Sequence, residues 1–189
     1  MVDLFGWGTG DNPIRLGEDH TFNNFVDWGS NTISNSNNTG WRILSLPEWE
    51  YLLDYRPGAA RKRGTATVGN VAGIVLLPDN WTAPSGVPVF SPTGDNIYTT
   101  VQWEAMENNG AIFLPFAGWS QNKPFASGAI TRTVERVDDC GFYWSSTPGV
   151  PESDEVPWAY CLRIPPFNNE WISDEGYYFW ISVRLARNL

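Results

Sequence analysis

The sequence is poor in the residues that most often build reactive centres. It contains two cysteines, Cys140 and Cys161, and a single histidine, His20, among 189 residues. One histidine excludes a three-histidine metal site, and any Ser-His-Asp or Cys-His mechanism would have to use His20. His20 lies in a polar stretch typical of a surface turn. The spacing of the cysteines matches no zinc, haem or CxxC signature. The sequence is compatible either with a disulfide between them or with two buried free thiols.

Long apolar runs and positive charge are also scarce. No stretch approaches the ~20 apolar residues of a membrane span, and the first residues do not form a secretory signal, so we expect no membrane insertion. Lys and Arg number 12 against 21 Asp and Glu, which gives a net charge of −9. An acidic balance argues against binding to a phosphate backbone, and we expect no nucleic-acid partner.

Aromatic residues, glycine and proline are abundant instead. The chain has 11 Trp, 7 Tyr and 10 Phe beside 18 Gly and 14 Pro. This mixture favours a compact, loop-rich protein in which large flat side chains hold an irregular backbone. The length fits one domain, with no internal repeat, so we expect a single domain over residues 1–189.

Two helices are predicted from their end signals. Ser45 and Glu48 form a capping-box pattern, and the helix that follows should stop before Pro57. Thr99 and Gln102 repeat the pattern for a second helix that ends at residues 108–110. The four basic residues near the end of the first helix are interpreted as a solvated loop, with a binding patch as the alternative: Arg56, Arg61, Lys62 and Arg63.

The remaining pattern indicates short strands. Buried strands are expected at 71–77 and 111–114, and further strands at 41–44, 141–144 and 158–164. The clearest period-two alternation runs from 178 to 187, whereas 165–176 is expected to be irregular. Two helices among short strands and long loops predict an α+β fold.

Five segments in order carry a resemblance to a known family: Trp41 to Leu53, Gly73 to Trp81, Gly110 to Gly118, Gly141 to Thr147, and Ser182 to Leu185. They resemble gut-bacterial and phage domains with the C-type-lectin-like fold, in the branch shared with formylglycine-generating enzymes. That branch includes the variable proteins of diversity-generating retroelements. Relatives commonly carry a further strand-rich segment before the region that starts this chain. The resemblance implies short twisted antiparallel sheets, and a phage particle or bacterial cell surface as the location.

The resemblance also implies a display surface formed by the last strands and their loops. The ligand-binding residues expected there are Trp158, Arg163, Phe167, Asn168, Asn169, Trp171, Asp174, Tyr177, Tyr178, Phe179 and Trp180. Tyr and Trp offer wide contact area at small entropic cost, and the segment has too many aromatics to bury on one face. In a diversified protein, the residues expected to be fixed are Trp158, Glu170, Trp171 and Trp180. The admissible variable positions are Arg163, Phe167, Asn168, Asn169, Asp174, Tyr177, Tyr178 and Phe179.

Catalysis is not expected. The copper site of formylglycine-generating enzymes needs two closely spaced cysteines, and the related iron-dependent sulfoxide synthases need three histidines; this chain has neither. Carboxylates gather in the C-terminal half, so a carboxylate-dependent hydrolase remains an alternative. No cofactor is expected, although Asn168, Asn169, Glu170, Asp174 and Glu175 supply ligand types suited to calcium, which stays open.

The sequence therefore predicts a non-catalytic ligand-binding domain that recognises a protein or glycan receptor. A variable protein of a diversity-generating retroelement is the favoured role. A surface adhesin or glycan-binding lectin of fixed specificity is the alternative among binding proteins.

Overall fold

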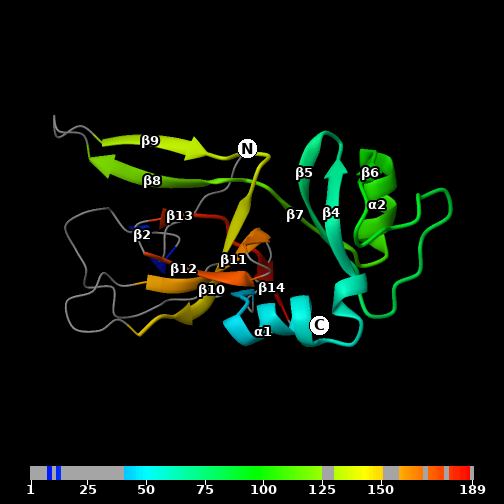
Figure 1. Cartoon of the computed structure of the whole chain (residues 1–189), viewed down its shortest axis with the longest axis horizontal. Coiled ribbons are helices and arrows are strands. Elements are labelled where there is room, and N and C mark those ends of the chain that lie inside the picture. Colours follow the sequence, from blue (N-terminus) through cyan, green and yellow to red (C-terminus); the bar gives the residue numbers. More distant parts are fainter. Residues whose placement is uncertain are drawn as a thin grey trace.

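The computed structural model shows an α+β protein in which two short helices accompany several small sheets (Figure 1). It describes residues 8–9, 12–13, 41–124, 130–150, 158–167, 170–176 and 179–187. The predictions for His20, Asn168, Asn169, Tyr177 and Tyr178 lie outside these residues. No described helix has both the length and the apolar character that a membrane crossing requires.

Two sheets form most of the scaffold. One has the order β6-β4-β5-β7, and contains β4 (Arg63–Val68), β5 (Val71–Leu76), β6 (Asn96–Tyr98) and β7 (Ile112–Pro115). The other has the order β10-β11-β12, and contains β10 (Gly141–Pro148), β11 (Trp158–Phe167) and β12 (Glu170–Gly176). All neighbours are antiparallel except β4 and β6, which are parallel.

Smaller strand pairs complete the fold. A third sheet has the order β13-β8-β9, from β8 (Trp119–Pro124), β9 (Ile130–Glu135) and β13 (Phe179–Trp180). Near the C-terminus, β14 (Leu185–Ala186) pairs with β3 (Arg42–Ile43), and β1 (Gly8–Thr9) pairs with β2 (Asn12–Pro13). The β3–β14 pair joins segments more than 140 positions apart, so it is a tertiary contact that no local pattern encodes.

Both predicted helices are confirmed, together with their caps. Helix α1 (Leu46–Glu50) starts after Ser45, whose N–H donates to the Glu48 carboxylate at 2.9 Å, and continues as a π-helical turn, η2 (Tyr51–Tyr55), that ends before Pro57. A 3-10 turn, η3 (Ala59–Arg61), follows. Helix α2 (Thr100–Asn108) starts after Thr99, which accepts from the Gln102 N–H, and the chain leaves it through Gly110 at φ 87°.

Glu48 also ties α1 to β3. Both of its oxygens accept from the Arg42 guanidinium, at 2.6 and 2.7 Å, and this pairing lowers the pKa of Glu48 from 4.5 to about 2. A depressed carboxyl pKa stabilises the fold above pH 4.5, and the contribution is lost as the pH falls toward 2.

Replacing Glu48 by glutamine is therefore expected to destabilise the protein at neutral pH. Because 37% of each partner's side chain is exposed, solvent screening limits the expected loss to about 1 kcal/mol. Urea unfolding at pH 7 and pH 3 measures it, and the difference between wild type and variant should shrink at pH 3. A loss that is the same at both pH values would contradict the ion-pair explanation.

Three hydrophobic clusters hold the sheets together. The first lies between α1 and the two large sheets and includes Trp49, Leu53, Leu114 and Leu162. The second joins β10 and β11 to Ile181 and contains Trp144, Cys140 and Cys161. The third packs α2, through Trp103 and Met106, on β4 and β5. Trp49, Trp103 and Trp144 are thus core residues.

The cysteines do not form a disulfide. Cys140 and Cys161 are free thiols buried in the second cluster. Burial raises the pKa of both thiols, so they stay protonated at neutral pH and act as small apolar side chains.

Two predicted segments differ from the structure. The stretch 165–176, expected to be irregular, contains the seven-residue strand β12. Most of its side chains have little strand preference, but pairing with β11 provides hydrogen-bond partners for its backbone. The stretch 178–187, expected to be one strand, is divided into β13, isolated bridges and β14, which pair with β8, β10 and β3 in turn.

The prediction that the four basic residues between 56 and 63 lie in a solvated loop is wrong in part. Arg56 is 5% exposed, and its guanidinium donates to the carbonyl oxygens of Leu52 and Leu77, each at 2.8 Å. Arg63 begins strand β4 and pairs with Asp54 at 3.2 Å. Of the four, only Arg61 is exposed, as a solvated loop would require. The other basic side chains bind parts of the scaffold that precede and follow them, which a count of charges does not reveal.

Candidate functional site

The β11–β12 hairpin brings two of the predicted ligand residues onto one face. In its antiparallel register Tyr160 lies opposite Asp174, and Trp158 lies opposite Gly176. Alternate residues of a strand share a face, and the Trp158 and Tyr160 rings meet edge to face with centroids 5.1 Å apart. Asp174 is exposed, whereas both rings are partly buried. We call Trp158, Tyr160 and Asp174 the hairpin patch; Tyr160 was not among the residues predicted from the sequence, although the alternation of β11 places it on the same face as Trp158.

The backbone beneath the hairpin patch is fixed by buried contacts. The hydroxyl of Ser145, which is fully buried, donates to the Tyr160 carbonyl oxygen at 2.8 Å. The Gly149 N–H donates to the Trp158 carbonyl oxygen at 2.8 Å, and the indole covers Gly149 so closely that a Cβ there would overlap the ring. The patch is therefore presented by a rigid strand rather than by a loop.

Arg163 and Glu175 lie on the opposite face of the same sheet. The Arg163 guanidinium carbon lies 5.8 Å from the centre of the Phe142 ring, in the register position directly across from it. Burial raises the pKa of Glu175 from 4.5 to about 7, with the negative charge of Asp174 adding to the shift and Arg163 opposing it. Because Asp174 and Glu175 are consecutive in a strand, their side chains point to opposite faces.

Trp171 lies at a separate place, against the first hydrophobic cluster. Arg63 covers its indole at 4.8 Å from the ring centre. Both residues line a cavity of about 250 Å³ together with Pro92 and Pro165. Nη1 of Arg63 is buried there and has no hydrogen-bond partner in the described part of the chain. Trp171 is therefore half-buried in the scaffold, and is not a neighbour of Trp158 in the hairpin patch.

Phe179 and Trp180 belong to the third sheet. Phe179 meets the Trp119 ring edge to face at 5.3 Å and packs on the second cluster, and Trp180 pairs with Ser120 in the strand register. For Phe167 only the backbone is described, at the end of β11. The predicted ligand residues that the structure describes thus occupy several surfaces instead of one.

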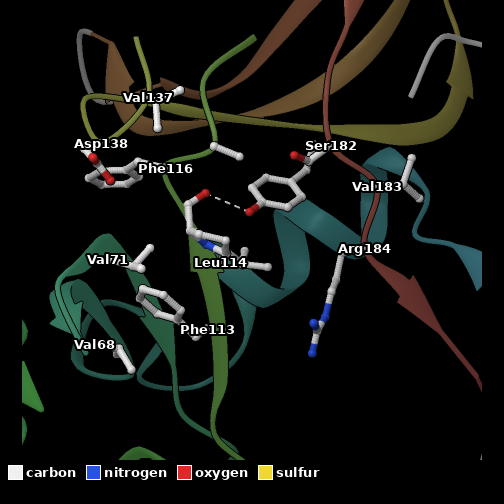
Figure 2. Close-up of a pocket in the computed structure, with 13 residues that line it drawn as sticks. Val68, Val71, Phe113, Leu114, Phe116, Val137, Asp138, Ser182, Val183 and Arg184 are labelled. Atoms are coloured by element: carbon white, nitrogen blue, oxygen red, sulfur yellow. Dashed lines mark hydrogen bonds between the residues drawn. The ribbon is translucent and has the colours of Figure 1, made fainter. Parts of the chain in front are cut away.

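A larger concave site lies elsewhere, between the two large sheets (Figure 2). We call it the inter-sheet groove. It encloses about 610 Å³ and is lined by Val68, Val71, Phe113, Leu114, Pro115, Phe116, Ala117, Val137, Asp138, Tyr143, Ser182, Val183 and Arg184. The Tyr143 hydroxyl donates to the Pro115 carbonyl oxygen at 2.8 Å across its base, and burial raises the pKa of that hydroxyl. The sequence did not predict the groove, because its walls come from five separate segments of the chain.

The described residues form no evident metal centre. Within residues 41–124 and the later described segments, no three His, Cys, Asp or Glu side chains are grouped as ligands for an ion. Of the residues that suggested calcium, Asn168 and Asn169 lie outside the described part, and Asp174 and Glu175 face away from each other.

Comparisons of the chain with protein-family models, with curated proteins and with solved structures gave no match.

Proposed function

We propose that the chain is a non-catalytic ligand-binding domain that presents the hairpin patch to a protein or glycan receptor. The observation that carries the proposal is the placement of two aromatic rings of β11 and an exposed carboxylate of β12 on one face of the hairpin, where buried contacts fix the backbone of β11. Rigid aromatic side chains bind partners at little entropic cost, and a charge at the edge of the contact selects among them.

The alternative of a carboxylate-dependent hydrolase has one observation in its favour, the raised pKa of Glu175. A glycosidase needs two carboxylates that flank one bond. The neighbouring Asp174 points away from Glu175, on the opposite face of β12. Receptor binding by the hairpin patch requires no such pair, because it uses Asp174 alone.

The role as a variable protein of a diversity-generating retroelement is the finer part of the proposal, with a phage particle or bacterial cell surface as its location. This role depends on the resemblance of the five sequence segments, and the α+β class that the resemblance implies is the class observed. A fixed-specificity adhesin or lectin would use the same patch without diversification.

Sequencing the DNA beside the gene separates these two roles. A diversified protein should have a reverse transcriptase nearby and a near-copy of the 3′ end of the gene. Differences between gene and copy should fall on adenine positions in the codons of exposed residues such as Asp174, and should spare Trp158 and Trp171. Absence of the near-copy would favour the fixed adhesin or lectin.

Replacing Asp174 by lysine is expected to weaken receptor binding about tenfold or more, because it reverses the only charge of the hairpin patch. The measurements are a glycan array, with and without a chelator, and flow cytometry of labelled protein on intact or protease-treated bacterial cells. Glu104→Lys, an equal charge change on the exposed face of α2, is the control. If Asp174→Lys and Glu104→Lys alter binding equally, the hairpin patch is not the receptor surface.

A further inference from the structure

The inter-sheet groove combines apolar walls with two isolated charges of opposite sign. Its volume of about 610 Å³ lies within the ~300–1,000 Å³ common for ligand sites. Val71 and Val137, on different walls, are 42% and 44% exposed, and in Figure 2 Phe116 lies between them while Phe113 lies on the far side of Val71. Leaving this much apolar surface in contact with water is unfavourable, so an apolar ligand that covers it gains free energy.

One wall of the groove is built before any ligand arrives. The turn that follows β9 has left-handed backbone at Arg136 and Asp138, with φ 59° and 65°. It is held by the Asp138 N–H, which donates to the Phe116 carbonyl oxygen at 2.8 Å, and by an ion pair of Arg136 with Asp139 at 2.6 Å. This turn sets the place of the Asp138 carboxylate at the rim, and pre-organisation of that kind lowers the entropic cost of binding.

The charges lie at separate rims. Figure 2 shows Asp138 beside Phe116 on one side of the groove and Arg184 on the other side, the side on which Val183 also lies. Both side chains are exposed, and neither forms an ion pair within the residues that the structure describes. The Arg136–Asp139 pair, by contrast, neutralises itself outside the groove. The groove therefore has a negatively charged carboxylate at one rim and a positively charged guanidinium at the other, with an apolar floor between them.

We propose that the inter-sheet groove binds an extended peptide segment of a partner protein. Apolar side chains of the peptide occupy the floor, a basic side chain pairs with Asp138, and an acidic side chain pairs with Arg184. A peptide matches this pattern because it carries opposite charges on both sides of an apolar stretch. A zwitterionic lipid carries both charges at one end, and most sugars lack the apolar body. The site is distinct from the hairpin patch and shares no residue with it.

The test uses fluorescence anisotropy of the full chain with four labelled hexapeptides. Each has the core Ala-Leu-Phe-Ala, flanked by Lys and Glu, by Glu and Lys, by two Lys, or by two Glu. One of the two mixed peptides should bind most tightly to the wild type. Arg184→Glu should shift the preference to the peptide with two Lys, about five- to tenfold, whereas Arg61→Glu, an exposed charge reversal outside the groove, should leave the order unchanged.

A second pair of variants tests the apolar floor independently of charge. Val137→Asp should abolish binding of every peptide, whereas Val89→Asp, at a residue 86% exposed outside the groove, should not. All four positions are exposed, so the variants are expected to fold, and circular dichroism checks this. Equal affinity for the four peptides, no saturable binding, or equal effects of Arg184→Glu and Arg61→Glu would overturn the proposal. Binding of 3-phenylpropionate as tightly as the best peptide would also overturn it, in favour of a small-molecule site.

Discussion

Replacing Gly118 by alanine is expected to lower the free energy of unfolding by about 3 kcal/mol or more, the largest effect that we predict. Gly118 has φ 70°, a conformation that costs a side-chain-bearing residue about 1 kcal/mol. A Cβ at this position would also overlap the carbonyl oxygen of Glu135 and press on the backbone of Arg136 and Val137. Since the Gly118 N–H donates to the Cys140 carbonyl oxygen at 2.7 Å, the chain cannot move away without losing that bond.

Gly86→Ala provides the matched control for this prediction. Gly86 has φ 80°, but no atom lies within 4 Å of a Cβ placed there. It should therefore show the conformational cost alone, about 1 kcal/mol. Urea unfolding of both variants measures the free energy of unfolding that each one loses. The difference between the two losses is the cost of the overlap between the Cβ at residue 118 and the 135–137 backbone. If Gly118→Ala costs no more than Gly86→Ala, the close packing of residue 118 against the 135–137 backbone is not a constraint on the fold.

Replacing Glu175 by glutamine is expected to stabilise the protein at pH 8 and to change its stability little at pH 4.5. The folded pKa of about 7 lies above the ordinary 4.5, so the folded protein binds the proton more tightly than the unfolded chain does. The stabilising contribution of the protonated carboxyl is full below pH 4.5 and is lost as the pH rises through 7. Allowing for partial exposure of the side chain, we expect a gain of about 2 kcal/mol at pH 8.

Thermal unfolding at the two pH values measures this gain. Glu170→Gln serves as control, because Glu170 lies at the start of the same strand with an exposed side chain. It should change the melting temperature by a small and equal amount at both pH values. If Glu175→Gln adds no stability at pH 8, then other groups in the folded protein offset the cost of burying the ionised carboxylate, and the prediction is wrong.

Local signals in the sequence were sufficient for both helices. Each has a side chain that caps its first turn and an apolar face that enters a cluster, and both signals lie within a few residues of the helix itself. The buried strands β5 and β7 were equally predictable, because a short apolar run has few other places to lie.

Strand β12 and the burial of Arg56 were not predictable in this way. Residues 170–176 are mostly polar, and they form a strand only because β11 offers a partner. Arg56 can be buried because its guanidinium donates a hydrogen bond to the carbonyl oxygen of Leu77, 21 positions further along the chain. The partner of Arg56 lies in a separate strand, whereas the partner of β12 is the preceding strand of the same hairpin, whose pairing the side chains of β12 alone do not encode.

The sequence by itself determined the α+β class, the two capped helices, the main apolar strands and the lack of a three-histidine site. These depend on composition and on interactions between near neighbours. Only the tertiary structure decided that Trp158 and Asp174 share a face while Phe179 belongs to another sheet, and that Asp138 and Arg184 border one apolar groove. Sites of this kind are assembled from segments far apart in the chain, and which segments meet is set by strand pairing and core packing rather than by any local pattern.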